Sequence, residues 1–390
     1  MSGTATRVSL PQSDGTVASY APGAAGAFEK PRSPIRSRVP LAAAHVVADP
    51  LAENIPGSTP RLDWEATLAY RRHLWSWGLG VAEAMDTAQR GMGLDWPVAA
   101  ELIRRTLREA KAVGGEVAAG AGTDQLAPGS ARVLDDIVRA YQEQCAVIEQ
   151  EGGQVVLLAS RELARIATGP EDYARVYETV LGELRRPAIL HWLGEMFDPA
   201  LTGYWGDADI ARATDACLSV IAAAGTRVGG IKVSLLSAEH EVGMRRRLPA
   251  GVRMYTGDDF NFPSLIEGDA HGHSDALLGI FDAIAPAASA ALQALDTGDR
   301  EGYRRLLEPT LPLSRHIFQA PTYNYKTGVV FLAYINGHQE HFRMVAGQES
   351  MRSVVHLAGL FVLADRAHLL TDPERACDRM RRVLALAGIV

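Results

Sequence analysis

The sequence predicts an α/β protein built as a closed (β/α)8 barrel, a TIM barrel, with a helical extension after it. Short apolar segments begin near residues 39, 79, 116, 154, 187, 230 and 252, mostly about 35 residues apart, and each longer gap contains a helical pattern. The apolar segments do not alternate with polar residues, which is typical of parallel strands buried on both faces. A final short strand near Gly272 gives eight units over roughly 250 residues, the size of a TIM barrel.

The individual elements follow from the apolar pattern and from residues that start or stop helices. The predicted strands are 39–47, 79–85, 116–121, 154–159, 187–193, 230–235 and 252–256. The predicted helices between them are 63–77, 95–113, 130–150, 170–184 and 207–224. Asp63 is suited to cap the first helix, Pro170 to open a helix at its first turn, and Gly225 to end one.

The composition changes at both ends of this repeating part. Residues 1–35 are rich in small residues and proline and predict a flexible N-terminal arm. Residues 36–286 form the predicted barrel, and residues 287–390 have helical periods throughout and form the predicted helical region. A doubly wound sheet is the alternative, but no GxGxxG motif opens the first unit.

Charge and cysteine content exclude several classes of protein. With 39 basic and 46 acidic residues the formal net charge is −7, and no basic cluster suits nucleic-acid binding. No apolar run approaches the roughly 18 residues of a membrane span, and the N-terminus lacks an apolar signal core. The three cysteines form no CxxC pair. We therefore expect a cytoplasmic protein that acts on a small molecule and contacts neither membrane nor nucleic acid.

One lysine stands out among the side chains expected at the barrel's catalytic end. The chain has only four lysines, and Lys232 lies within residues 229–236 (GGIKVSLL), which are otherwise uncharged. Burial disfavours the charged form of an amine, and a neutral amine can attack a carbonyl to form a Schiff base. The competing interpretation is a structural ion pair of Lys232 with Asp258 or Asp259.

The order of these segments resembles the dihydrodipicolinate synthase and N-acetylneuraminate lyase superfamily. The match runs from about residue 38 to residue 286: GAGT after strand 3, PAILHW followed by Thr202-Gly203 at strand 5, GIK on strand 6, Gly257-Asp258-Asp259 after strand 7, and Ser274 with Pro286 near strand 8. The resemblance implies a lyase, of aldolase or hydro-lyase type, with a covalent Schiff base on Lys232 and no other cofactor. It also implies a homo-oligomer, a dimer or tetramer.

Two segments depart from the family pattern and point to a divergent branch. The family's catalytic tyrosine on strand 5 falls on His191, which we predict to be the proton shuttle. The alternative is a structural histidine that is hydrogen-bonded at the end of the strand. The hydroxyl-rich stretch that binds a 2-oxo acid falls on Asp86 and Thr87. We predict that Asp86, Thr87 and Glu83 bind a keto-sugar or sugar-acid derivative, because carboxylates accept hydrogen bonds from hydroxyls. The carboxylates of Asp86 and Glu83 could equally cap the next helix. Gly257, Asp258 and Ser274 complete the predicted substrate site.

Two alternatives remain open from the residues. His271 and His273, with Asp258, Asp259, Asp86, Glu83 or His191, could hold a divalent metal that polarises a carbonyl in an aldolase or isomerase. The barrel could also bind a sugar without catalysing a reaction.

Overall fold

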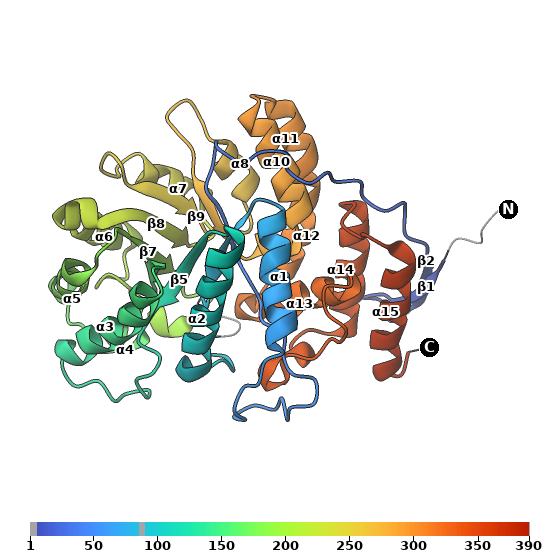
Figure 1. The fold of residues 1–390 in the computed structure, drawn as a ribbon, viewed down its shortest axis with the longest axis horizontal. Helices are drawn as coiled ribbons and strands as arrows, with labels where there is room; N and C mark the ends of the chain where they lie inside the picture. Colours follow the sequence, from blue (N-terminus) through green and yellow to red (C-terminus); the bar gives the residue numbers. More distant parts are fainter. Residues whose placement is uncertain (1–5, 86–89, 390) are drawn as a thin grey trace. The chain divides into compact units, whose positions relative to one another are not determined.

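The computed structural model describes residues 6–85 and 90–389, and it contains a closed barrel of eight parallel strands (Figure 1). Each strand pairs with the next along the chain, and the last pairs with the first. The strands are β3 (Pro40–Ala43), β4 (Gly80–Glu83), β5 (Val117–Ala121), β6 (Gln154–Leu157), β7 (Ala188–Leu193), β8 (Val228–Ser234), β9 (Arg253–Thr256) and β10 (Asp275–Leu278). The predicted fold class, a TIM barrel followed by C-terminal helices, is confirmed.

The eighth strand begins later than predicted. Residues 269–272 form a tight turn in which the amide of Asp269 donates to the carbonyl of Gly272, and Gly272 has φ +140°. This turn occupies the place where the sequence predicted the strand, so β10 starts only at Asp275. His271, His273 and Ser274 therefore precede the strand instead of following it.

The chain divides into two compact units. The barrel unit comprises residues Arg38–Ala44 and Leu79–Gly279, and the helical unit comprises Met1–Ser37, His45–Gly78 and Ile280–Val390. This division differs from the predicted boundaries, because the helix after the first strand, α1 (Trp64–Ser76), groups with the C-terminal helices. Within the described residues of both units, no helix is long and apolar enough to cross a membrane.

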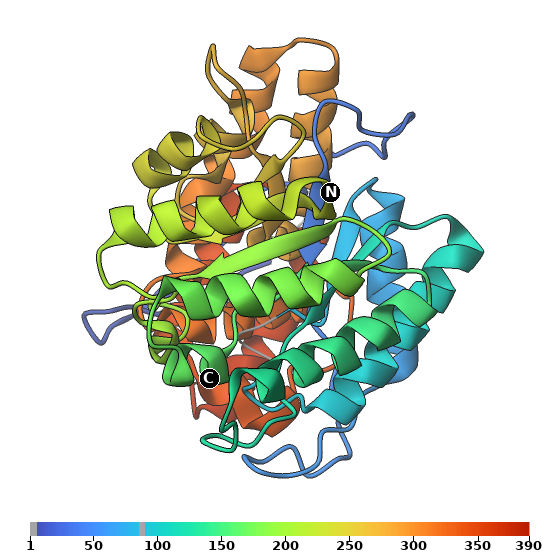
Figure 2. The same ribbon diagram turned by 90° about the vertical axis from the view of Figure 1, so that its left-hand side faces the viewer.

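Helices of the barrel unit surround the strands that they connect (Figures 1 and 2). Neighbouring outer helices such as α3 and α5, or α5 and α6, pack against each other. The helices are α2 (Trp96–Val113), α3 (Leu134–Gln150), α4 (Arg161–Ile166), α5 (Pro170–Glu183), α6 (Ile210–Ala224), α7 (Ala238–Arg245) and α8 (Phe262–Glu267). Asp95 and Asp209 cap α2 and α6 by accepting backbone amides, which satisfies N–H groups that have no partner inside the helix.

The helical unit begins with a hairpin of β1 (Val8–Pro11) and β2 (Val17–Tyr20), where the sequence predicted a flexible arm. The side chains of Val8 and Leu10 are buried, and the Tyr20 hydroxyl donates to Asp365. The small-residue composition gave no sign of these contacts, which tie the segment to distant helices. After α1 the unit continues with α9 (Ile280–Ala283), α10 (Ala285–Asp296), α11 (Arg300–Leu307), α12 (Leu311–Ile317), α13 (Tyr325–Ile335), α14 (Val354–Arg366) and α15 (Pro373–Leu386).

A buried carboxylate organises the interior of the helical unit. Asp282 of α9 accepts a hydrogen bond from the backbone amide of His45 (2.7 Å), and its oxygens lie 3.0 Å from the His45 Nδ1 and 3.3 Å from the Lys326 ammonium. The His45 Nε2 faces the Oε1 of Gln339, whose Nε2 donates to the carbonyl of His341. Both ring nitrogens of His45 thus face side-chain oxygens. Burial by itself would raise the pKa of Asp282, but the charges of His45 and Lys326 hold it well below its ordinary value.

We expect Asp282→Asn to lower the free energy of unfolding by about 3–5 kcal/mol, because it leaves the buried Lys326 ammonium without its carboxylate and removes a partner of the buried His45 ring. Chemical denaturation followed by circular dichroism measures this. Asp378→Asn is the matched control: it removes an exposed carboxylate paired with Arg382 and should leave the stability nearly unchanged. Equal stability of the two variants would show that the buried carboxylate does not stabilise the unit.

Candidate active site

The apolar layer inside the barrel establishes which strand residues point inward. It is formed by side chains from seven of the eight strands or the residues just after them: Leu41, Ala43, Ala82, Met85, Ala118, Val156, Leu158, Ile189, Tyr255 and Leu277. Successive strand residues point to opposite faces. His191 lies two residues after Ile189, and Lys232 pairs in register with both His191 and Tyr255. His191 and Lys232 therefore point into the barrel from adjacent strands.

Two glycines make room for the Lys232 side chain and for the residues around it. A Cβ on Gly257 would lie 2.7 Å from the Cε of Lys232 and 2.9 Å from the carbonyl of Val233, and it would overlap the hydroxyl of Ser234. A Cβ on Gly230 would lie 2.6 Å from the ring of Tyr255. The Tyr255 ring thus fills the barrel beside Gly230, below Lys232 in the direction of the strand beginnings. Lys232 is 7% exposed in this setting.

His191 is fully buried at 0% exposure and bonds to a second residue of β8. Its Nε2 lies 3.1 Å from the Oγ of Ser234, which is two residues beyond Lys232 and so on the same face of the strand. The register predicted for strands 5 and 6 is confirmed. It brings together the Lys232 amine and the His191 imidazole, which the sequence predicts as site residues, and the Ser234 hydroxyl, which it does not.

Asp258 and Asp259 follow β9 at the catalytic end of the barrel and are buried. The Asp258 carboxylate accepts the backbone amides of Phe260 and Asn261 and the side-chain amide of Asn261. Its own amide donates to the hydroxyl of Thr256. Asp258 thereby shapes the turn that presents Gly257 to Lys232.

Glu83 lies on the opposite face of its strand from the barrel interior. Ala82 belongs to the interior layer, so Glu83 points outward, where its carboxylate accepts the hydroxyl of Thr106 of α2 at 2.6 Å. The prediction that Glu83 binds substrate inside the barrel is not supported by this placement. The segment with Asp86 and Thr87 lies outside the described residues.

The residues flanking that segment form an anchor that the sequence reasoning missed. Ala84 has φ +49°, and its carbonyl lies 2.6 Å from the point where a Cβ of Gly120 would stand. The buried Arg90 donates to the carbonyls of Ala84 and Gly120 and to the carboxylate of Asp124. The glycine in the GAGT turn therefore admits a carbonyl of the neighbouring strand, and Arg90 clamps the catalytic ends of β4 and β5 together.

Ser274 lies outside the ring of strands, where it contacts the buried carboxyl group of Glu241. Its hydroxyl donates to the carboxylate of Glu241 of α7 at 2.7 Å, and the Thr256 hydroxyl donates to the other oxygen at 3.0 Å. Burial raises the pKa of Glu241 to about 8, although both hydroxyls act in the opposite direction. Ser274 precedes β10, at the barrel end where the strands begin, so the structure does not place it with Lys232.

His271 and His273 lie at that same end, in the turn between α8 and β10. They are thus separated from His191, Asp258 and Asp259 by the length of the barrel. No group of three or more His, Cys, Asp or Glu side chains suited to a metal ion occurs among residues 6–85 and 90–389. The structure therefore does not bring the two histidines together with the other described residues named for that metal site.

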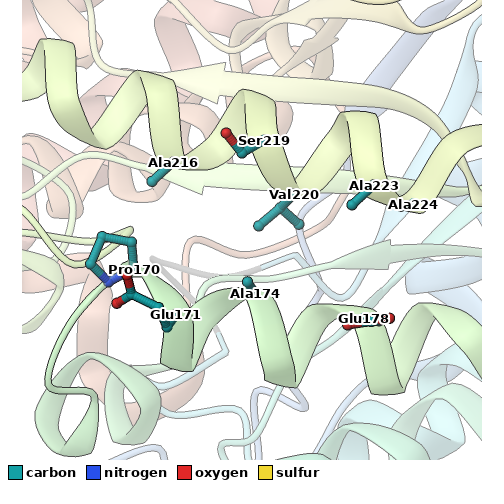
Figure 3. A pocket seen from close by; sticks show the side chains of 9 residues that line it. All are labelled: Pro170, Glu171, Ala174, Glu178, Ala216, Ser219, Val220, Ala223 and Ala224. Atoms are coloured by element: carbon teal, nitrogen blue, oxygen red, sulfur yellow. The ribbon is translucent and has the colours of Figure 1, made fainter.

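A groove on the outside of the barrel unit lies between α5 and α6 (Figure 3). It has a volume of about 380 Å³, and four of its nine lining residues are alanines, with Glu171 and Glu178 on α5. None of the predicted site residues borders it. We therefore place the candidate active site at Lys232, inside the barrel, and not at this groove.

Comparison with known proteins agrees with this architecture. The sequence profile of the family described as "Protein of unknown function (DUF993)" matches residues 8–389. The chain belongs to this family. No curated protein has a matching sequence.

Solved structures similar to this DUF993 protein include dihydrodipicolinate synthases. The enzyme from Aquifex aeolicus has a TM-score of 0.59 at 14% identity, over 90% of this chain and 98% of that one. Those from Oceanobacillus iheyensis (TM-score 0.56, 14% identity, 80% and 89% covered) and Bacillus clausii (0.58, 12%, 90% and 99%) are also similar. At such low identity these matches establish a shared fold.

We expect Gly257→Ala to destabilise the DUF993 protein by about 1–3 kcal/mol, because the new methyl group must displace backbone as well as the Lys232 stem. Unfolding of the variant and of the native protein in denaturant measures the loss of stability. Gly243→Ala in α7 is the control, since a Cβ there meets nothing within 4 Å and alanine favours a helix. If Gly257→Ala is as stable as the control, the packing described around Lys232 is wrong.

Glu241 predicts a specific pH dependence of stability. Its pKa in the folded protein, about 8, lies above the ordinary value of 4.5. Its contribution to stability is therefore complete below pH 4.5 and is lost as the pH rises through 8. Glu241→Gln cannot titrate, so the variant should gain stability relative to the native protein between pH 5 and pH 9. The exposed Glu239→Gln on the same helix should track the native protein; a parallel course of all three proteins contradicts the buried acid.

Proposed function

We propose that this protein is a lyase that forms a Schiff base between Lys232 and the carbonyl of a keto-sugar or sugar-acid derivative. The observation that carries the proposal is the placement of Lys232 inside the barrel, in register with the buried His191 and next to Ser234. An amine withdrawn from water loses the hydration that favours its ammonium form. The fold shared with dihydrodipicolinate synthase structures supports a lyase in general terms.

The proposed chemistry begins with attack of the Lys232 Nζ on the carbonyl carbon, which gives a carbinolamine. A proton donated to the carbinolamine hydroxyl lets it leave as water, and the nitrogen lone pair forms the iminium. The iminium then accepts the electron pair of a neighbouring bond. Breaking a C–C bond gives aldol cleavage, and removing an adjacent proton before a β-hydroxyl leaves gives dehydration. His191 is the proposed acid and base for these proton transfers.

The substrate class rests on the sequence after the second barrel strand. Asp86 stands where the superfamily has hydroxyls that bind a carboxylate, and a carboxylate in that place repels an anionic group while accepting hydrogen bonds from sugar hydroxyls. Pyruvate is therefore an unfavourable ligand under this proposal. The choice between aldol cleavage and dehydration, and the dimer or tetramer implied by the resemblance, stay predictions.

Reaction with 1,3-dihydroxyacetone, the smallest ketose, followed by borohydride reduction tests the nucleophile. We expect one adduct by intact mass and its assignment by peptide mapping to Lys232, with only Lys30, Lys111 and Lys326 as competing side chains. Lys232→Arg should abolish the adduct, because arginine does not deprotonate in proteins. Lys111→Arg, on the exposed face of α2, is the control and should react like the native protein. An adduct that survives in Lys232→Arg refutes the assignment.

A further inference from the structure

Ser234 occupies the position between the two groups that the proposed chemistry uses. Its Oγ is 3.1 Å from the Nε2 of His191. The point where a Cβ of Gly257 would stand overlaps this Oγ and is 2.7 Å from the Lys232 Cε. The hydroxyl thus touches the imidazole on one side and the space next to the Lys232 stem on the other.

The position of this hydroxyl is fixed by the strand. Ser234 is the last residue of β8 and is 2% exposed. Its carbonyl accepts the backbone amide of Gly194, which holds it to the end of the neighbouring β7. The absence of a side chain on Gly257 leaves the room that the hydroxyl fills. A hydroxyl held in this way needs little reorganisation to pass a proton in either direction.

We propose that Ser234 is a proton-relay residue, which carries protons between His191 and the intermediate on Lys232. The inference rests on the proposed Schiff-base function and extends it by a group that neither the sequence reasoning nor the comparisons named. Because His191 is fully buried, its proton moves through neighbouring polar groups and not directly to bulk water. Ser234 is such a group and is already hydrogen-bonded to it.

The relay step balances in protons and electrons. When the carbinolamine loses its hydroxyl, the Ser234 hydroxyl donates its proton to the departing oxygen and takes the Nε2 proton of an imidazolium at His191. The C–O bond breaks, water leaves, and the lone pair of the Lys232 nitrogen completes the iminium. Hydrolysis of the iminium runs the same transfers in reverse, so Ser234 ends each cycle as a neutral hydroxyl.

The experiment measures the rate of Schiff-base formation with 1,3-dihydroxyacetone between pH 5 and pH 9, using timed borohydride quenches and intact mass. We expect Ser234→Ala to form the same Lys232 adduct at least tenfold more slowly, and to lose the limb of the pH profile that His191→Asn also loses. The double variant should be no slower than either single variant, since both remove one relay. Ser234→Thr restores a hydroxyl and should recover the profile.

A matched control comes from the outer helices. Thr214 of α6 bonds its Oγ1 to the Nε2 of His240 at 2.8 Å, a hydroxyl–imidazole pair outside the strand ring. Thr214→Val should leave the rate and the pH profile unchanged. If Ser234→Ala does not fold, Ser234→Cys replaces it in the same comparison, because a thiol is a poorer donor.

The outcomes separate the relay from the proposed function. No adduct on Lys232 in the native protein, with dihydroxyacetone or with pyruvate, overturns the Schiff-base proposal and the relay with it. An adduct that forms in Ser234→Ala with the native rate and profile overturns the relay alone. Losses that add in the double variant show that Ser234 acts independently of His191 and also overturn it.

Discussion

The burial of one amine inside a closed ring of strands is the constraint on which the candidate site depends. A barrel interior offers a lysine little water, so its immediate neighbours decide whether the amine is a structural cation or a nucleophile. Here the neighbours leave room for it: Gly230 and Gly257 lack the side chains that would collide with Tyr255, Ser234 or the Lys232 stem. The apolar layer at Tyr255 closes the barrel beneath, and the polar pair of His191 and Ser234 lies beside the Lys232 stem.

In the helical unit, a buried charged group is paired with other buried polar groups. Asp282 there is paired with His45 and Lys326, and Gln339 completes the hydrogen bonds of the imidazole. Nearby, the ring centroids of His73 and His338 lie 4.1 Å apart with the rings tilted, and burial lowers the pKa of His73 to about 3 and that of His338 to about 4. Both rings are therefore neutral near pH 7 beside the charged pair. In this unit the buried Asp282 carboxylate has partners of complementary chemistry, which suits a structural role for these residues.

The sequence predicted the barrel because strand length, spacing and helix starts are local properties, visible in segments such as residues 187–193 and at Pro170. It also predicted His191 and Lys232 at equal height, because neighbouring parallel strands pair in register. It did not fix which face each side chain uses. Strands buried on both faces lack the alternation that sets orientation, so Glu83 was expected inside and lies outside. Ser274 was expected after the last strand, but the turn at residues 269–272 makes β10 begin only at Asp275, so Ser274 precedes it. Ser234 could have been predicted, because a residue two positions after Lys232 lies on the same face of the strand.

The protein combines a known fold with an altered set of polar groups, a histidine and a serine near the lysine. A crystal structure of the protein after borohydride reduction with 1,3-dihydroxyacetone tests the proposed role of Lys232 most directly. The account predicts continuous electron density from the Lys232 Nζ to the central carbon of the probe, with the probe's oxygens in hydrogen-bonding reach of Ser234 or His191. Density on another lysine, or a probe bound without a covalent link to Lys232, would contradict it.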